Sequence, residues 1–198
     1  LCELLTPRFE TSSDTARRYL SNILTDFEKS VAANKASPAE TSHERTILTF
    51  LLAEASKSQV RVASGREENK RRELLEKVLE LDPKAARAAL ELAKYYSGTF
   101  RNPTESDRYA RLAVSLAPRW VEARVFAARV AGMKGLDGEI ERELNSLLKE
   151  FPEHPAVLRY AGYYRGLRGD YAGSDELFKR CLYKGDYTDT YARERLFS

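Results

Sequence analysis

Three prolines divide the second half of this 198-residue chain at nearly constant intervals. Pro83, Pro118 and Pro152 each follow a charged segment with an apolar stripe, and they lie 35 and 34 residues apart. A fixed period of this length predicts a stack of supersecondary units that bury their apolar faces against their neighbours. Because proline cannot continue a helix but fits the first turn of the next, we expect each of these prolines to open a new helix.

A second break falls inside each period and divides it into two helices. The breaks are Ser97-Gly98 with Asn102-Pro103, then Gly135 to Gly138, then Gly169-Asp170. Between the breaks, apolar residues recur three and four positions apart and no stretch alternates with period two, which predicts helices and no strands. Each period is therefore expected to hold two antiparallel helices of about 12–16 residues.

The first part of the chain is expected to be helical as well. Residues 13–33 carry an apolar stripe on one face, which predicts an amphipathic helix. Ser37-Pro38-Ala39-Glu40 is a capping box, so a second helix is expected from there to Ser64. A third helix is expected over 67–81, where Glu lies three or four residues from Lys or Arg and forms a solvated outer face.

Residues 155–186 resemble the tetratricopeptide repeat (TPR) family most clearly. Ala161-Gly162 stands where that family has a Leu-Gly pair, and Gly169-Asp170-Tyr171 matches its turn between the two helices. The second helix matches the family's small, aromatic, small series at Ser174, Phe178 and Cys181.

Three packing expectations come with this match. Gly162 and the small residues of the second helix should let the two helices approach closely, and Phe178 should fill the space between repeats. Asp170 should cap the second helix by accepting a hydrogen bond from a free backbone N–H. Elsewhere the repeats are more degenerate: the family's first-helix Trp is absent, and Arg165 stands where Tyr is usual.

The resemblance implies an all-α, right-handed superhelical solenoid of antiparallel helix pairs. It covers residues 84–186 firmly and 38–83 loosely. We therefore expect an N-terminal segment, 1–36, with one amphipathic helix packed on the solenoid, followed by about four helix pairs over 37–186. The remaining residues, 187–198, are expected to form a capping helix or the start of a truncated repeat.

In the TPR family the first helix of each pair lines the concave face, where a peptide or a helix is bound. Aromatic and arginine side chains are frequent energetic anchors at interfaces, worth about 2 kcal/mol or more each. The Lys/Asn pattern with which some TPR domains hold a chaperone tail is missing here. The residues expected to bind a partner are Tyr95, Phe126, Arg129, Met133, Arg159, Tyr160 and Tyr163, with Glu91 and Glu122 on the same face.

No pattern in the sequence indicates catalysis, a metal or a cofactor. The chain contains no P-loop, no dinucleotide-binding glycine motif and no Gly-x-Ser-x-Gly. His43 and His154 are the only histidines and lack neighbours suited to a metal site, and His154 is expected to cap the helix that follows it. Cys2 and Cys181 cannot build a disulfide framework, and Cys181 is expected to be a small core residue.

The predicted function is a non-catalytic protein-interaction scaffold that binds a peptide, a helix or a neighbouring domain on its concave face. One alternative is a self-associating domain, or one that docks within a larger multidomain protein. Another is a helical-repeat RNA binder, although 33 Lys and Arg against 30 Asp and Glu leave a net charge of only +3. No apolar run is long enough to cross a membrane. The missing initiator Met suggests a fragment of a longer protein, which we expect to be soluble, with the cytoplasm favoured.

Overall fold

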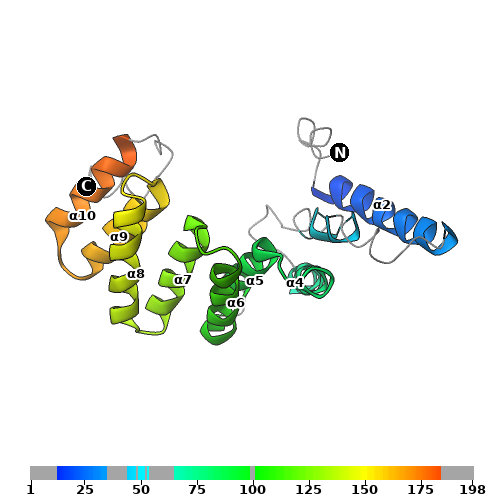
Figure 1. Ribbon diagram of the computed structural model, residues 1–198, viewed down its shortest axis with the longest axis horizontal. Coiled ribbons are helices and arrows are strands. Elements are labelled where there is room, and N and C mark those ends of the chain that lie inside the picture. Colours follow the sequence, from blue (N-terminus) through cyan, green and yellow to red (C-terminus); the bar gives the residue numbers. More distant parts are fainter. Residues whose placement is uncertain are drawn as a thin grey trace. The chain divides into compact units, whose positions relative to one another are not determined.

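In the computed structural model, every described secondary-structure element is an α-helix (Figure 1). The chain divides into two compact units, the N-terminal unit Leu1–Arg101 and the C-terminal unit Asn102–Ser198. The structure describes residues 13–34, 44–47, 49–51, 53, 65–98 and 101–183.

In the N-terminal unit, helix α2 (Ser13–Asn34) packs its apolar stripe against residues that follow it in the chain. Leu20 and Leu24 are buried and contact Leu51 and Leu74. The stripe that predicts a helix over 13–33 is therefore the surface through which α2 joins its unit.

Helices α4 (Gly65–Leu81) and α5 (Ala86–Gly98) pack against each other in the same unit. Leu75 and Val78 of α4 are fully buried. In α5 every residue from 88 to 93 is buried, so this helix is covered on most of its circumference. Such all-round burial is typical of a helix enclosed by neighbours, and it changes which α5 side chains are available to a partner.

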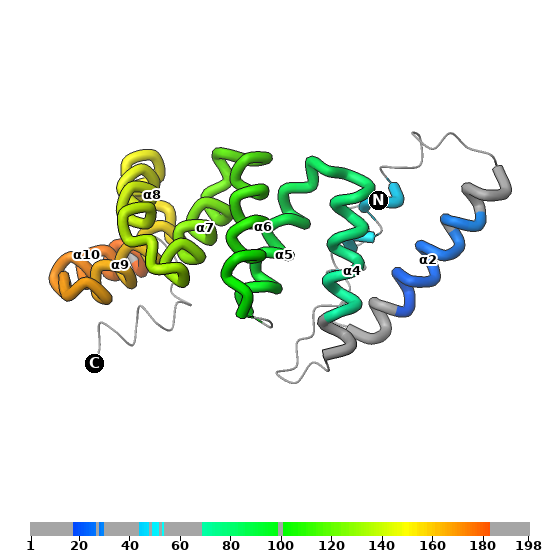
Figure 2. The backbone as a smooth tube through the Cα atoms, turned by 90° about the horizontal axis from the view of Figure 1, so that it is seen from below, coloured from blue at the N-terminus to red at the C-terminus, as the bar shows by residue number. Residues whose placement is uncertain are grey.

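In the described part of the C-terminal unit, five helices follow one another and each packs against the next (Figure 2). Helix α7 also packs against α9. The second helices of the repeats begin at Pro103, Asp137 and Tyr171, which are 34 residues apart, so the period read from the sequence is the period of the structure. The five are α6 (Pro103–Leu116), α7 (Val121–Met133), α8 (Asp137–Glu150), α9 (Pro155–Leu167) and α10 (Tyr171–Tyr183).

The turns between repeats have one hydrogen-bond register. In the middle turn Ala117 N donates to Ala113 O at 3.0 Å, and Trp120 N donates to Ala117 O at 3.0 Å. Bonds of the same spacing begin at Asp82 and at Phe151. The three prolines lie inside these turns, three residues before the next helix, and so they do not occupy its first turn as expected. Their fixed φ instead suits the second position of a β-turn.

The turns within repeats also share one geometry. Leu136 N donates to Ala131 O at 3.0 Å, and Asp170 N donates to Arg165 O at 3.0 Å, 34 residues later. The residue before each donor is a glycine with positive φ, +72° at Gly135 and +84° at Gly169. These bonds satisfy the last carbonyls of α7 and α9, and the left-handed backbone they require explains the glycines.

The pair α9 and α10 shows the close packing expected of the best-matching repeat. Phe178 is only 1% exposed, and Gly162 lies directly against its ring. Asp170 Oδ1 accepts a hydrogen bond from Gly173 N at 2.9 Å, so the predicted cap of α10 is confirmed. Cys181 is fully buried and its thiol lies 3.5 Å from Pro155 O, which makes it a small core residue as predicted.

Several sequence-based expectations lie outside the described residues. They are the capping box at Ser37–Glu40, most of the helix expected to reach Ser64, the environment of Cys2 and of His43, and the C-terminal cap over 187–198.

Candidate functional site

Helices α7 and α9 lie side by side and carry six of the seven predicted partner-binding residues. Phe126, Arg129 and Met133 are three or four positions apart and form a stripe along α7. On α9, Tyr163 lies three or four positions from Tyr160 and Arg159, so these three share one side of that helix. Met133 is 45% exposed and Tyr163 40% exposed, whereas Phe126 and Tyr160 are half-buried. We call this surface the α7/α9 face; it consists of Phe126, Arg129, Met133, Arg159, Tyr160 and Tyr163.

Tyr160 connects the two helices of this face. Its hydroxyl donates a long hydrogen bond, 3.4 Å, to Ala128 O on α7. A Cβ at Gly132 would lie 3.4 Å from the same hydroxyl, at ordinary van der Waals distance, so the hydroxyl lies against the backbone of α7. The Tyr160 ring stacks on Tyr163, with ring centroids 6.3 Å apart and planes inclined by 28°. Burial raises the pKa of the Tyr160 phenol to about 12, against the lowering effect of the nearby Arg129 charge.

Arg129 presents an exposed guanidinium that lies 6.0 Å from the centre of the Phe126 ring, at the limit of a cation–π contact. It forms no ion pair with any residue in the described part of the chain. The preceding arginine of α7 differs: Arg124 donates to Glu143 at 2.6 Å and to Glu150 at 2.8 Å. The α7/α9 face therefore combines exposed aromatic and thioether surface with a positive charge that forms no ion pair among the described residues.

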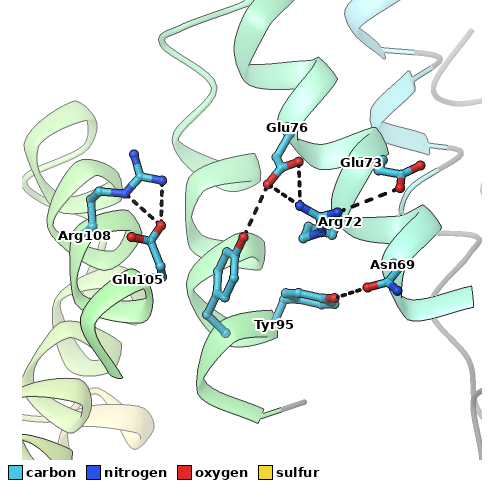
Figure 3. Close-up of polar contacts among 8 residues, drawn as sticks. Asn69, Arg72, Glu73, Glu76, Tyr95, Glu105 and Arg108 are labelled. Carbon is cyan, nitrogen blue, oxygen red and sulfur yellow. Dashed lines mark hydrogen bonds and ion pairs between the residues drawn. The ribbon is translucent and has the colours of Figure 1, made fainter. Parts of the chain in front are cut away.

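The structure places Tyr95, the seventh predicted residue, in the interior. It is 3% exposed, and its hydroxyl donates to Asn69 Oδ1 on α4 at 3.1 Å (Figure 3). Its ring meets that of Tyr96 edge to face, with centroids 5.3 Å apart. Tyr95 therefore packs α5 on α4 and is left out of the α7/α9 face.

Glu91, expected on the same surface as Tyr95, is also buried. It accepts a hydrogen bond from Arg71 at 2.6 Å, and Lys94 binds its other oxygen at 2.6 Å. The signal for this burial was present in the sequence, because α5 has Ala or Leu on nearly every side. Such a helix has little surface to offer a ligand.

At the other end of α7, the Glu122 carboxylate is about half exposed, 3.8 Å from His154 Nε2. His154 is the residue that precedes α9, but its side chain makes no capping hydrogen bond. The expectation that it caps the helix is therefore wrong. Its Nδ1 is buried and has no hydrogen-bond partner within the described chain.

A cleft of 800 Å³ lies between α6, α7 and α8, and no motif in the sequence indicated it. Its α7 residues are Arg124, Ala127, Ala128 and Ala131. Charged residues of α6 and α8 form its rim, namely Asp107, Arg111, Glu139, Arg142 and Glu143.

Neither a metal centre nor a membrane span is found in what the structure describes. Among the residues in the ranges given above, no three His, Cys, Asp or Glu side chains gather closely enough to hold a metal ion. No helix in those ranges has both the length and the apolar character needed to cross a bilayer.

Comparison with solved structures identifies the architecture. The thermophilic TPR protein TTC0263 of Thermus thermophilus matches with a TM-score of 0.61 at 14% identity, over 93% of this chain and 97% of the other. The fold is of the TPR type. MamA matches with a TM-score of 0.59 at 14% identity, over 93% of this chain and 100% of its own. YrrB, another TPR protein, gives 0.59 at 13% identity, over 90% and 83% of the two chains.

These matches confirm the predicted all-α, TPR-like solenoid of helix pairs. At such low identity they concern the fold alone. No protein-family model matches the chain, and no curated protein sequence matches it.

Proposed function

We propose that this protein is a non-catalytic interaction module that binds a peptide or a helix of another protein on the α7/α9 face. The TPR fold is one in which stacked helices present an extended surface, which suits a scaffold. The observation that carries the proposal is the exposed Arg129 guanidinium, which lies 6.0 Å from the centre of the Phe126 ring, acts electrostatically on Tyr160 and forms no ion pair in the described chain.

The side chains of this face are suited to hold a ligand with little loss of entropy. The stacked rings of Tyr160 and Tyr163 have few rotatable bonds, and Tyr160 is further fixed by its hydrogen bond to α7. Met133 adds an adaptable apolar contact at the end of α7. One structural neighbour, YrrB, is described as having an unusual peptide-binding site, which supports a peptide as the ligand class.

A nucleic-acid ligand is a poorer match to these observations. Binding to phosphates requires a concentration of Lys and Arg, whereas six of the ten arginines that the structure describes in the C-terminal unit form ion pairs. Arg111, Arg124, Arg168 and Arg180 each contact a carboxylate within 3.0 Å.

The proposal is tested by comparing variants of the full chain on an array of peptides of random sequence. Tyr163→Ala and Arg129→Gln alter exposed positions of the face. Each should lower the affinity for the peptides that the unmodified chain binds by about tenfold. Tyr171→Ala is a matched control, because Tyr171 is a 60% exposed tyrosine on α10, outside the face. Circular dichroism should show unchanged helix content in all three.

A combined Phe126→Ala and Tyr160→Ala variant removes the half-buried part of the face. It should abolish binding of the peptides that Tyr163→Ala and Arg129→Gln weaken, and it should keep the helices. If the array pattern of these variants matched that of the unmodified chain, the α7/α9 face would not be the binding surface.

A further inference from the structure

Helix α7 has a second surface that the proposed function does not use. Successive residues of an α-helix are rotated by about 100°, so Ala131 lies nearly opposite Phe126 and Met133, and Ala127 lies about a third of a turn away from them. These two alanines form part of the floor of the 800 Å³ cleft between α6 and α8, which we call the α6/α8 cleft.

The floor of the α6/α8 cleft is formed by short, apolar side chains. Ala127 is half-buried and Ala128 and Ala131 are buried, and Val114 of α6 adds a further apolar contact. Because alanine extends only one carbon from the backbone, a ligand can approach the α7 axis closely. The volume falls within the range of specific ligand sites.

The lining of the cleft has the length of a short helical segment. On α6 it runs from Asp107 to Ser115, which corresponds to about 12 Å of helix axis, or two turns. A helix lying between α6 and α8 would therefore place two or three apolar side chains on the alanine floor, in the helix-in-groove mode of recognition.

The charges on the rim of the cleft indicate which sign of charge a ligand should carry. Each rim carboxylate already has a cation: Asp107 and Glu139 both bind Arg111, at 3.0 and 2.8 Å, and Glu143 binds Arg124 at 2.6 Å. Arg142 is different, because its Nε donates to the Gly138 carbonyl at 3.1 Å and no described carboxylate pairs with it. The rim thus has one exposed cation available and no available carboxylate among the described residues.

We propose that the α6/α8 cleft docks an amphipathic helix of a partner protein, with an apolar stripe on the alanine floor and an acidic residue at Arg142. This site is separate from the α7/α9 face and lies on the other side of α7. It adds a second partner surface to the module, and it does not depend on the first.

The test uses the full chain and a set of helix-locked peptides of about 14 residues, near the length at which helices become stable alone. Each peptide carries Leu, Ile or Phe at the first, fifth and eighth positions and one Glu beside this stripe. A matched set has Lys in place of Glu. Fluorescence anisotropy with labelled peptides measures binding.

We expect peptides of the Glu set to bind and their Lys counterparts to bind about tenfold more weakly. Arg142→Glu should reverse this preference, and Arg142→Lys should keep it. Ala127→Glu should abolish binding by placing a charge on the apolar floor; because Arg142 is exposed, its variants test the site even if Ala127→Glu unfolds.

Two controls separate this site from the α7/α9 face. Tyr163→Ala should leave peptide binding to the cleft unchanged. The proposal is overturned if neither peptide set binds, if the preference for Glu does not follow Arg142, or if Tyr163→Ala removes binding. None of these results would affect the random-peptide test of the α7/α9 face.

Discussion

A Cβ placed on Gly162 would lie 3.1 Å from Cε1 of the Phe178 ring and 3.2 Å from Cδ1 and Cζ. Phe178 is 1% exposed, so the ring has little room to move away. The close packing of α9 on α10 at this point therefore depends on a residue that has no side chain.

Gly162→Ala should destabilise the protein by about 1–2 kcal/mol. Overpacking of a filled core costs about 1–3 kcal/mol, of which the better helix propensity of alanine recovers part. Gly138→Ala is the control, since a Cβ there meets nothing within 4 Å, and it should be neutral or stabilising. Chemical denaturation measures both, and equal stability of the two variants would contradict the packing argument.

The ion pair between Arg71 and Glu91 should be more sensitive to loss of the acid than to loss of the base. Both side chains are over nine-tenths buried and lie 2.6 Å apart. Glu91→Leu leaves Arg71 without this carboxylate, at a cost of about 3 kcal/mol. Arg71→Met should cost less, because Glu91 keeps Lys94 at 2.6 Å.

Replacing both partners, as Arg71→Met with Glu91→Leu, should recover most of the lost stability, because no buried charge then remains unpaired. Urea denaturation of the four proteins forms a double-mutant cycle. If the double variant lost as much unfolding free energy as the two single variants together, the two side chains would not act as a pair.

Asp107 should make the C-terminal unit sensitive to acid. Burial alone would raise the pKa of this carboxyl, but hydrogen bonds from Lys134 at 2.6 Å and Arg111 at 3.0 Å outweigh it and hold the pKa below its usual value. The ionised group therefore stabilises the fold above the ordinary pKa of aspartate. This contribution is lost as the pH falls through the lowered pKa.

Asp107→Asn should consequently lower the free energy of unfolding at neutral pH by about 1 kcal/mol, with a smaller difference near pH 3. Asp26→Asn serves as the comparison, because Asp26 is 76% exposed and 3.6 Å from its lysine. A deficit of Asp107→Asn that stays constant with pH would show that the carboxylate charge is not involved.

Tyr160 should be among the last tyrosines to ionise. Its pKa of about 12 is raised by burial, so the neutral phenol is favoured in the folded state. That stabilisation is complete below the ordinary pKa of tyrosine and is lost as the pH rises through the raised value. The difference in phenolate absorbance between the unmodified chain and Tyr160→Phe measures this titration; an ordinary pKa would contradict the packing of Tyr160 on α7.

Arg101→Gly should stabilise the protein by about 1 kcal/mol. Arg101 has a φ of +44° and lies 34 residues before Gly135, so it holds the left-handed position that the other two repeats give to glycine. Arg101→Ala keeps the unfavourable backbone and should bring no gain. Thermal unfolding compares the unmodified chain with the two variants. An equal gain from Arg101→Ala would show that the arginine side chain, and not the left-handed backbone, is the cause.

The period, the helix pairs and the close contact at Gly162 could all be predicted, because each depends on residues near in sequence. The alanines and leucines around α5 indicate the burial of Tyr95 and Glu91, but their partners Asn69 and Arg71 could not be predicted, because these lie on the preceding helix. Helical spacing shows which side chains share a stripe but not which neighbour covers that stripe.

The α6/α8 cleft was missed for a related reason. Alanines at 127, 128 and 131 have the composition of a core stripe, and two of them are buried. Only the spacing of α6 and α8 shows that the space above them is open. The prolines were misplaced by a few residues because a β-turn and a helix start both accept the same φ.

The shared hydrogen-bond register of the turns has a consequence for how such a chain can change in evolution. The turn bonds beginning at Ala117 and at Phe151 have the same spacing. A duplicated copy of residues 119–152 inserted after Pro152 could therefore be joined to its neighbours at both ends by turns of this same geometry. Each insertion would add its own stability and one more contact with its neighbour. Duplication or deletion of a gene segment can thus lengthen or shorten the solenoid by whole repeats without any change in the turns that connect them.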